Sequence, residues 1–142
     1  MTARLLDVIF KKIILLVSEI TKGIKVSVES KFEPAHSSVA HRKYVHSYTI
    51  KIENTSLVTV QLMRRHWKIT DADLNVKEVR GEGVVGQKPI LEPGASHIYS
   101  SWCPIRTEIG NMKGTYQMRR EDNSTFKVRV PQFVLCASSK LN

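Results

Sequence analysis

The chain has 142 residues, 42% of them hydrophobic and 25% charged, so it is long enough for one domain with a sizeable core and too apolar for a disordered protein. Twenty-two lysines and arginines against 13 acidic residues give a net charge of +9, which favours an anionic partner. The two cysteines, Cys103 and Cys136, are far apart in sequence, which argues against a zinc finger or a disulfide scaffold. The longest apolar run near the N-terminus, IILLV, is too short for a signal peptide or a membrane span, and we expect a cytoplasmic protein.

The N-terminal segment has helical periodicity. From Arg4 to Ile20, apolar residues recur at steps of three and four, with Asp7 near the start and Gly23 after the end. This pattern predicts an amphipathic helix within an N-terminal extension, residues 1–22. It could dock on the domain, pair with another chain or touch a membrane.

After Gly23 the period changes to alternation, which predicts strands. The segments with this pattern lie at residues 24–29, 44–53, 58–69, 97–101, 112–118 and 126–135. Side-chain parity changes between Leu62 and Trp67, so we expect a β-bulge around Met63 to His66, and it changes again at Pro131. Short strands joined by turns, without helices between them, predict an all-β antiparallel sandwich of about seven strands.

Two positions suggest an immunoglobulin-like plan. Trp67 lies in the middle of a strand, where such domains bury a tryptophan, and Tyr116 and Met118 have the spacing of a tyrosine corner, with Met in the place of a cysteine. Because no disulfide is available there, a fibronectin type III-like sandwich is the closer comparison.

Six segments in the same order resemble the ApaG domain family: GIKVSVES, YTIKIEN, VQLMRRHWKITD, GEGVVGQKPILEPG, IGNMKGTYQM and FKVRVPQFVL. The resemblance covers most of the chain and implies a fibronectin-like domain at residues 23–136, followed by a tail at 137–142. It implies no catalytic residue and brings an association with cobalt and magnesium resistance and with diadenosine tetraphosphate metabolism. His46, Trp102 and Glu108 depart from the family pattern, the last two in an expected loop. The first 20 or so residues have no counterpart in the family, and our hypothesis is that residues 1 to about 15 are an artefact of start-site assignment or a weakly docked helix.

Gly81 to Gly86 spell G-x-G-x-x-G, but Pro89 and Pro93 prevent the helix that a dinucleotide-binding turn needs. One interpretation is a β-turn or bulge in which glycine supplies positive φ. The other is a nest of backbone N–H groups for a diphosphate, flanked by Lys77. The diphosphate-loop candidates are Gly81, Gly83, Gly86, Arg80 and Lys88.

A basic patch is a second candidate site. Its candidate residues are Arg64, Arg65, Arg119 and Arg120, which Lys127 and Arg129 would join if their strands share a sheet. Such a face could bind a phosphate backbone or an acidic peptide, or could be a solvated sheet surface. Without a recognition helix or a set of stacking aromatics, sequence-specific nucleic-acid binding is not expected.

Metal and nucleophile chemistry have weaker signals. His36, His41 and His46 are five residues apart, a spacing that places neighbours on opposite faces of a strand, so we assign no metal ligands. Cys103 would need His97 as a base, and nothing in the sequence brings the two together. We therefore expect no catalytic residues and no cofactor.

These observations favour a non-enzymatic protein-interaction module that binds another protein through its loops and a sheet edge. Unpaired edges also make a homodimer plausible. The alternative is a binder of phosphorylated nucleotides or other diphosphates at Gly81 to Gly86.

Overall fold

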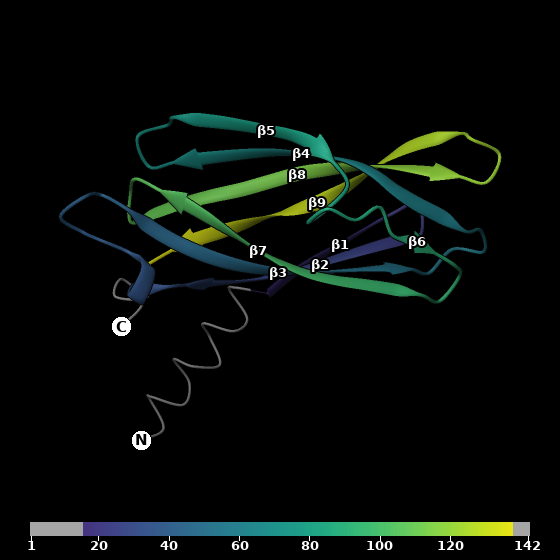
Figure 1. Ribbon diagram of the computed structural model, residues 1–142, viewed down its shortest axis with the longest axis horizontal. Coiled ribbons are helices and arrows are strands. Elements are labelled where there is room, and N and C mark those ends of the chain that lie inside the picture. Colours follow the sequence, from purple (N-terminus) through teal and green to yellow (C-terminus); the bar gives the residue numbers. More distant parts are fainter. Residues whose placement is uncertain (1–15, 138–142) are drawn as a thin grey trace, which may run out of the picture.

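The computed structural model describes residues 16–137, which form two antiparallel sheets facing each other (Figure 1). The first sheet has the order β1 (Leu16–Thr21), β2 (Ile24–Phe32), β3 (Tyr44–Asn54), β7 (Ser96–Ile105). The second has the order β5 (Val76–Glu82), β4 (Val60–Asp71), β8 (Ile109–Arg120), β9 (Thr125–Cys136), with β6 (Ile90–Leu91) also paired to β4. A short 3-10 helix, η1 (Pro34–His36), precedes β3. The all-β sandwich is confirmed, with nine strands among residues 16–137, including β1 and the short β6.

The predicted helix over Arg4–Ile20 is wrong at its C-terminal end, because Leu16–Thr21 is strand β1; residues 1–15 lie outside the described residues. β1 forms a hairpin with β2 through Lys22 and Gly23, which both have positive φ. That combination matches a two-residue hairpin turn, so hydrogen bonding to β2 overrides the local helical period. The first sheet therefore begins at Leu16, before the boundary at residue 23 that the resemblance implied.

Both predicted changes of parity occur. The pairing of β4 with β8 shifts register between Leu62 and Arg64, within the expected bulge. The pairing of β8 with β9 shifts between Met112 and Gly114, opposite the segment that contains Pro131. Each shift keeps apolar side chains on the inner face along the whole of a long strand.

Aromatic rings form the centre of the core. Trp67 is buried, as predicted, with its ring edge-on to Tyr48, Tyr116 and Phe133. Gly114 lies opposite Trp67 in the β4–β8 register, and a Cβ there would come within 2.7 Å of the indole. The absence of a side chain at Gly114 therefore makes room for the ring.

The buried Tyr116 hydroxyl pairs with the Tyr99 hydroxyl. This side-chain partner replaces the backbone partner of a tyrosine corner. The bond links β8 of the second sheet to β7 of the first. It satisfies a hydroxyl that would otherwise be buried without a partner.

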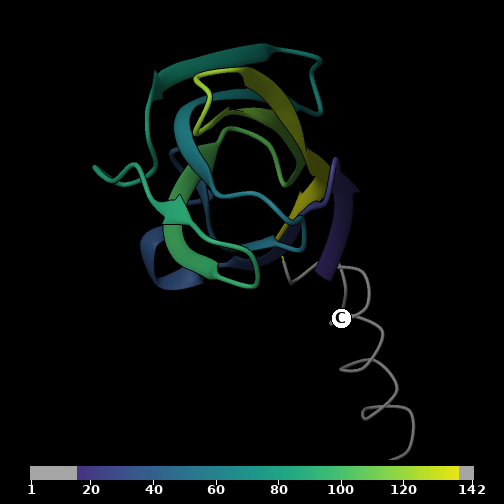
Figure 2. The same cartoon turned by 90° about the vertical axis from the view of Figure 1, so that its right-hand side faces the viewer.

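The two long sides of the sandwich differ. On one side β1 lies beside β9, and the end-on view shows the two strands adjacent (Figure 2). Thr21 Oγ1 accepts a hydrogen bond from the Arg129 backbone N–H at 3.2 Å, and Glu19 lies 3.9 Å from the Arg129 guanidinium. On the other side a cavity of about 190 Å³ lies between β5 and β7. Within residues 16–137, no helix has the length and hydrophobicity to span a membrane.

Candidate binding surfaces

The glycine segment forms a tight hairpin turn. Val84 and Gln87 exchange two backbone hydrogen bonds, of 2.8 and 3.0 Å, around Val85 and Gly86, whose φ values are 46° and 75°. Two central residues with positive φ define a type I′ turn, so the β-turn interpretation describes the geometry. Gly83 also has positive φ, and a Cβ there would lie 2.3 Å from the Gln87 oxygen.

Several donors of the proposed diphosphate nest already have partners. The N–H groups of Gly83, Val84 and Gln87 all donate to backbone oxygens, Gly83 to that of Met63. Lys88 lies 3.0 Å from the Glu82 carboxylate. A diphosphate at this turn would have to compete with bonds that hold the hairpin together.

The other flanking residues point in different directions. Gly81 lies on the inner side of β5, where a Cβ would touch the Arg65 guanidinium. Arg80 lies on the outer face, 3.4 Å from the Glu78 carboxylate. Gly86 is at the tip of the turn with open space around it. The diphosphate-loop candidates thus lie on both faces of β5 and at the tip of the turn, and they do not converge on one site.

The arginines of the predicted basic patch also separate. Arg65 shares parity with buried Trp67, and its guanidinium donates to the Glu82 and Gly83 carbonyl oxygens at 3.0 and 2.9 Å. Arg64 is exposed and pairs with Glu82 at 3.5 Å. The side chains of the consecutive residues 64 and 65 therefore lie on opposite sides of β4, that of Arg64 outside and that of Arg65 inside.

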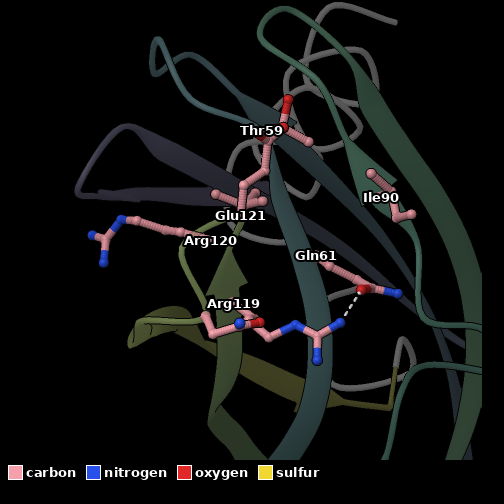
Figure 3. A pocket seen from close by; sticks show the side chains of 8 residues that line it. Thr59, Gln61, Ile90, Arg119, Arg120 and Glu121 are labelled. Atoms are coloured by element: carbon pink, nitrogen blue, oxygen red, sulfur yellow. Dashed lines mark hydrogen bonds between the residues drawn. The ribbon is translucent and has the colours of Figure 1, made fainter.

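Arg119 and Arg120 diverge in the same way (Figure 3). Arg119 donates to the Gln61 side-chain oxygen at 2.9 Å beside a hollow of about 260 Å³, whereas Arg120 points away from it. The Arg120 guanidinium lies 4.0 Å from the centre of the Phe126 ring, a cation–π contact.

The outer face of the second sheet nevertheless collects positive charge, because β4, β8 and β9 are neighbours. We call this surface the basic face and define it by Arg64, Lys68, Arg80, Lys113, Lys127 and Arg129. Two adjoining hollows of about 530 and 430 Å³ lie on it and share His66, Thr115 and Lys127. The sequence interpretation missed Lys68 and Lys113, although their alternation with buried Trp67 and Met112 identifies them as outward-facing.

β7 is the second notable surface. The sequence interpretation placed Trp102 in a loop, but it lies within β7 with 52% of its surface exposed; Glu108 does lie between strands. The Trp102 ring meets His36 edge-on, with centroids 5.0 Å apart, over a hollow that Lys43, Val45 and Pro104 complete. An exposed indole beside a sheet edge is a typical feature of a protein-binding surface.

The three histidines of the loop region do not converge. His36 lies in η1, His41 is exposed in the following turn, and His46 is buried in β3. Among residues 16–137, no group of three or more His, Cys, Asp or Glu side chains is arranged to hold a metal ion.

Cys103 and His97 occupy one strand six residues apart, a separation of about 20 Å in extended chain. Cys103 instead lies opposite His46, and both are buried. Burial raises the pKa of the Cys103 thiol to about 11 and lowers the pKa of His46 to about 4. Both groups are therefore neutral near pH 7, which is the opposite of an activated thiolate–imidazolium pair.

Known proteins share this sequence and architecture. The family model described as the ApaG domain matches residues 34–120. Protein ApaG of Brucella suis biovar 1 is 48% identical over 118 residues, 83% of this chain and 91% of the relative. Protein ApaG of Brucella anthropi is 50% identical over 116 residues, 82% and 89% of the two chains.

Solved structures agree. The crystal structure of an ApaA protein from Bordetella pertussis superimposes with a TM-score of 0.77 at 43% identity, covering 80% of this chain and 92% of that one. The C-terminal domain of wzt, at 8% identity and a TM-score of 0.52 over 85% and 77% of the two chains, shares the fold alone. From the match over more than half of its length and these relatives, the chain belongs to the ApaG domain family.

Proposed function

We propose that this ApaG domain is a non-enzymatic protein-interaction module that binds an extended segment of another protein along the free edge of β7. The observation that carries the proposal is the composition of this edge. The ten residues of β7, SHIYSSWCPI, include no lysine, arginine, aspartate or glutamate, in a chain with a net charge of +9.

Exposed edge strands are usually protected against pairing by charge, by a bulge or by a covering segment. At the edge of the second sheet, β5 carries Lys77, Glu78, Arg80 and Glu82. On the opposite side β1 and β9 lie against each other, so each covers the other. Among residues 16–137, no strand pairs with the outer edge of β7, and its residues Ser96–Cys103 carry no charged side chain of Lys, Arg, Asp or Glu. Pro104, which lacks an N–H, limits pairing at the end of the strand.

The side chains along β7 suit an incoming strand. Ile98 and Trp102 are 60% and 52% exposed on the outer face, where same-face residues of a partner strand would cover them. On the inner side the cavity between β5 and β7 contains Arg65 and Lys77. Within residues 16–137, neither forms an ion pair with a carboxylate. An extended segment with apolar side chains on one face and an acidic side chain on the other would match both sides.

The chemistry of the buried groups also supports a binding role. Burial holds Cys103 and His46 in their neutral forms and raises the pKa of Tyr99 and Tyr116 far above the range of a general base. His46 and Tyr116 lie in the core, and Cys103 is buried but lines the cavity of about 190 Å³ between β5 and β7. A neutral thiol, and not an activated nucleophile, therefore borders that cavity.

The alternative, binding of a phosphorylated nucleotide at Gly81 to Gly86, has less support because the turn uses its own N–H groups. The family's association with cobalt and magnesium resistance remains a prediction for this chain. Isothermal titration with pyrophosphate and with Co²⁺ tests each directly.

Substituting a charged residue into the edge tests the main proposal. Ile98→Lys places a charge on β7, and Val76→Lys is a matched control, an equally exposed apolar residue on the charged edge β5. A photo-crosslinker at Ser100 should capture the same partner in the wild-type and Val76→Lys backgrounds and lose it with Ile98→Lys. Equal capture by all three would refute the proposal. Sedimentation velocity shows whether the captured chain is a second copy of this protein.

A further inference from the structure

We infer that the basic face binds a chain of phosphate groups, as found in a nucleic-acid backbone or in inorganic polyphosphate. This site is independent of the β7 edge, since it lies on the outer face of the other sheet. It extends the four-arginine patch that the sequence suggested, of which Arg64 lies on the basic face and Arg65 lines the smaller hollow, while Arg119 and Arg120 line neither hollow.

The registers place the outer residues in rows that cross the sheet. One row runs Glu82, Arg64, Gln117, Lys127 across β5, β4, β8 and β9. The next row runs Arg80, His66, Thr115, Arg129, and the third runs Glu78, Lys68, Lys113. Successive rows are about 6.7 Å apart, which is two residues along a strand. Each row contributes positively charged side chains, so a chain of phosphates that lies along the strands would meet cations in every row.

In the third row two like charges face each other. Lys68 lies directly opposite Lys113, a cross-strand arrangement that is destabilising unless an anion compensates it. Lys68 has the Glu78 carboxylate 3.7 Å away. Among residues 16–137, Lys113 and Lys127 have no ion pair, and both line the larger hollow.

The carboxylates on this face lie at its margins. Glu78 and Glu82 are on the edge strand β5, and Glu19 reaches the face from β1. Glu78 pairs with His66, Lys68 and Arg80, so its negative charge is balanced by these three side chains at the β5 margin of the face. The centre of the face, between Lys113 and Lys127, thus presents positive charge and the neutral groups of Thr115 and Gln117.

The hollows fit phosphates better than they fit bases. Trp67 points into the core, and among residues 16–137 no phenylalanine, tyrosine or tryptophan lines either hollow. The ring that does line them is that of His66, whose Nε2 lies 3.3 Å from the Glu78 carboxylate, so recognition rests mainly on phosphate oxygens. Arg64, Arg80 and Arg129 offer planar guanidinium donors, and Thr115 and Gln117 offer neutral donors between them. A phosphate chain carries regularly spaced negative charges and has no apolar groups to bury. It therefore suits open hollows that are lined mainly by polar and positively charged side chains.

Fluorescence anisotropy with two labelled probes tests the inference: inorganic polyphosphate and a single-stranded oligothymidylate. The variant Lys113→Ala/Lys127→Ala should weaken binding of at least one probe by about tenfold and reduce the slope of log K against log salt by about 1.4. The control Lys25→Ala/Lys31→Ala removes the same charge from β2, in the first sheet, and should bind like wild type. All four lysines lie on the sheet surface, and circular dichroism verifies that each variant is folded.

The two probes distinguish the sources of phosphate. Tighter binding of polyphosphate assigns the site to the inorganic polymer, and tighter binding of the oligonucleotide assigns it to a nucleic-acid backbone. Polyglutamate of similar length is the third probe. If it binds as tightly as both phosphate probes, or if the two double variants lose affinity equally, the site does not select phosphate and the inference is wrong.

Discussion

His46 of β3 lies directly opposite Cys103 of β7, and burial shifts the pKa values of the two side chains in opposite directions. Both shifts favour the neutral form. We therefore expect this end of the first sheet to be sensitive to pH and its thiol to be unreactive.

Stability should fall on mild acidification because of His46. Burial lowers its pKa from 6.5 to about 4, although the nearby backbone of Cys136 and Tyr44 partly opposes this effect. Among residues 16–137, the ring nitrogens of His46 have no hydrogen-bond partner of good geometry. The unfolded chain therefore takes up the proton first, and roughly 3 kcal/mol of stability present above pH 6.5 is lost as pH falls toward 4. Urea denaturation at a series of pH values measures this loss.

His46→Phe keeps a ring beside Phe32 and removes the titratable group. Its free energy of unfolding should change much less between pH 6.5 and 4 than that of the wild type. His41→Gln, at an exposed position, serves as the control and should retain the wild-type pH profile. A profile for His46→Phe that still falls by the full amount would show that another group is responsible.

Native Cys103 should react slowly with thiol reagents. A pKa near 11 instead of 9.0 reduces the thiolate fraction about 100-fold near pH 8, and burial restricts access further. In a Cys136→Ala variant, Ellman's reagent should label the remaining thiol at least that much faster in guanidinium than under native conditions. Rapid native labelling would contradict the buried position of Cys103.

Gly114→Ala should destabilise the fold by about 1–3 kcal/mol. The added methyl group would lie 2.4 Å from the His66 carbonyl oxygen and 2.7 Å from the Trp67 ring, beside the aromatic cluster of the core. Thr115→Ala, the neighbouring outward position, should change stability by less than about 0.5 kcal/mol. Urea melts of the two variants provide the comparison, and similar losses in both would argue against a packing effect.

The Tyr99–Tyr116 hydroxyl pair should behave non-additively. Tyr99→Phe leaves the fully buried Tyr116 hydroxyl without its partner and should cost about 1–3 kcal/mol. The double variant Tyr99→Phe/Tyr116→Phe removes both hydroxyls and should be more stable than Tyr99→Phe alone. Denaturation of both single variants and the double variant closes the cycle; strictly additive losses would show that the hydroxyls do not interact.

Alternation of apolar and polar residues was sufficient to predict most of the sandwich and both register shifts. The N-terminal segment shows where this reasoning stops. Leu16, Val17 and Ile20 fit a helical stripe and a short strand equally well, because few residues are available to separate the two periods. Hydrogen bonding to β2 stabilises the strand conformation of this segment, and sequence periodicity does not report that pairing.

The candidate surfaces were harder to predict. Adjacent arginines in the sequence suggested one patch, yet alternation sends Arg64 and Arg65 to opposite sides of β4. The basic face instead combines residues from β4, β5, β8 and β9, which extend over 65 positions of the sequence from Arg64 to Arg129. Only the strand order brings them into neighbouring rows.

The sequence by itself determined that this chain folds as an antiparallel sandwich, since a period of two and turn-forming residues are local properties, and the resemblance of six segments to the ApaG domain indicated the family. The tertiary structure alone decided which strands lie at the edges, which edge lacks charge, and which cations share a face. Those properties depend on strand order and register, and long-range hydrogen bonding and burial of the common core set both.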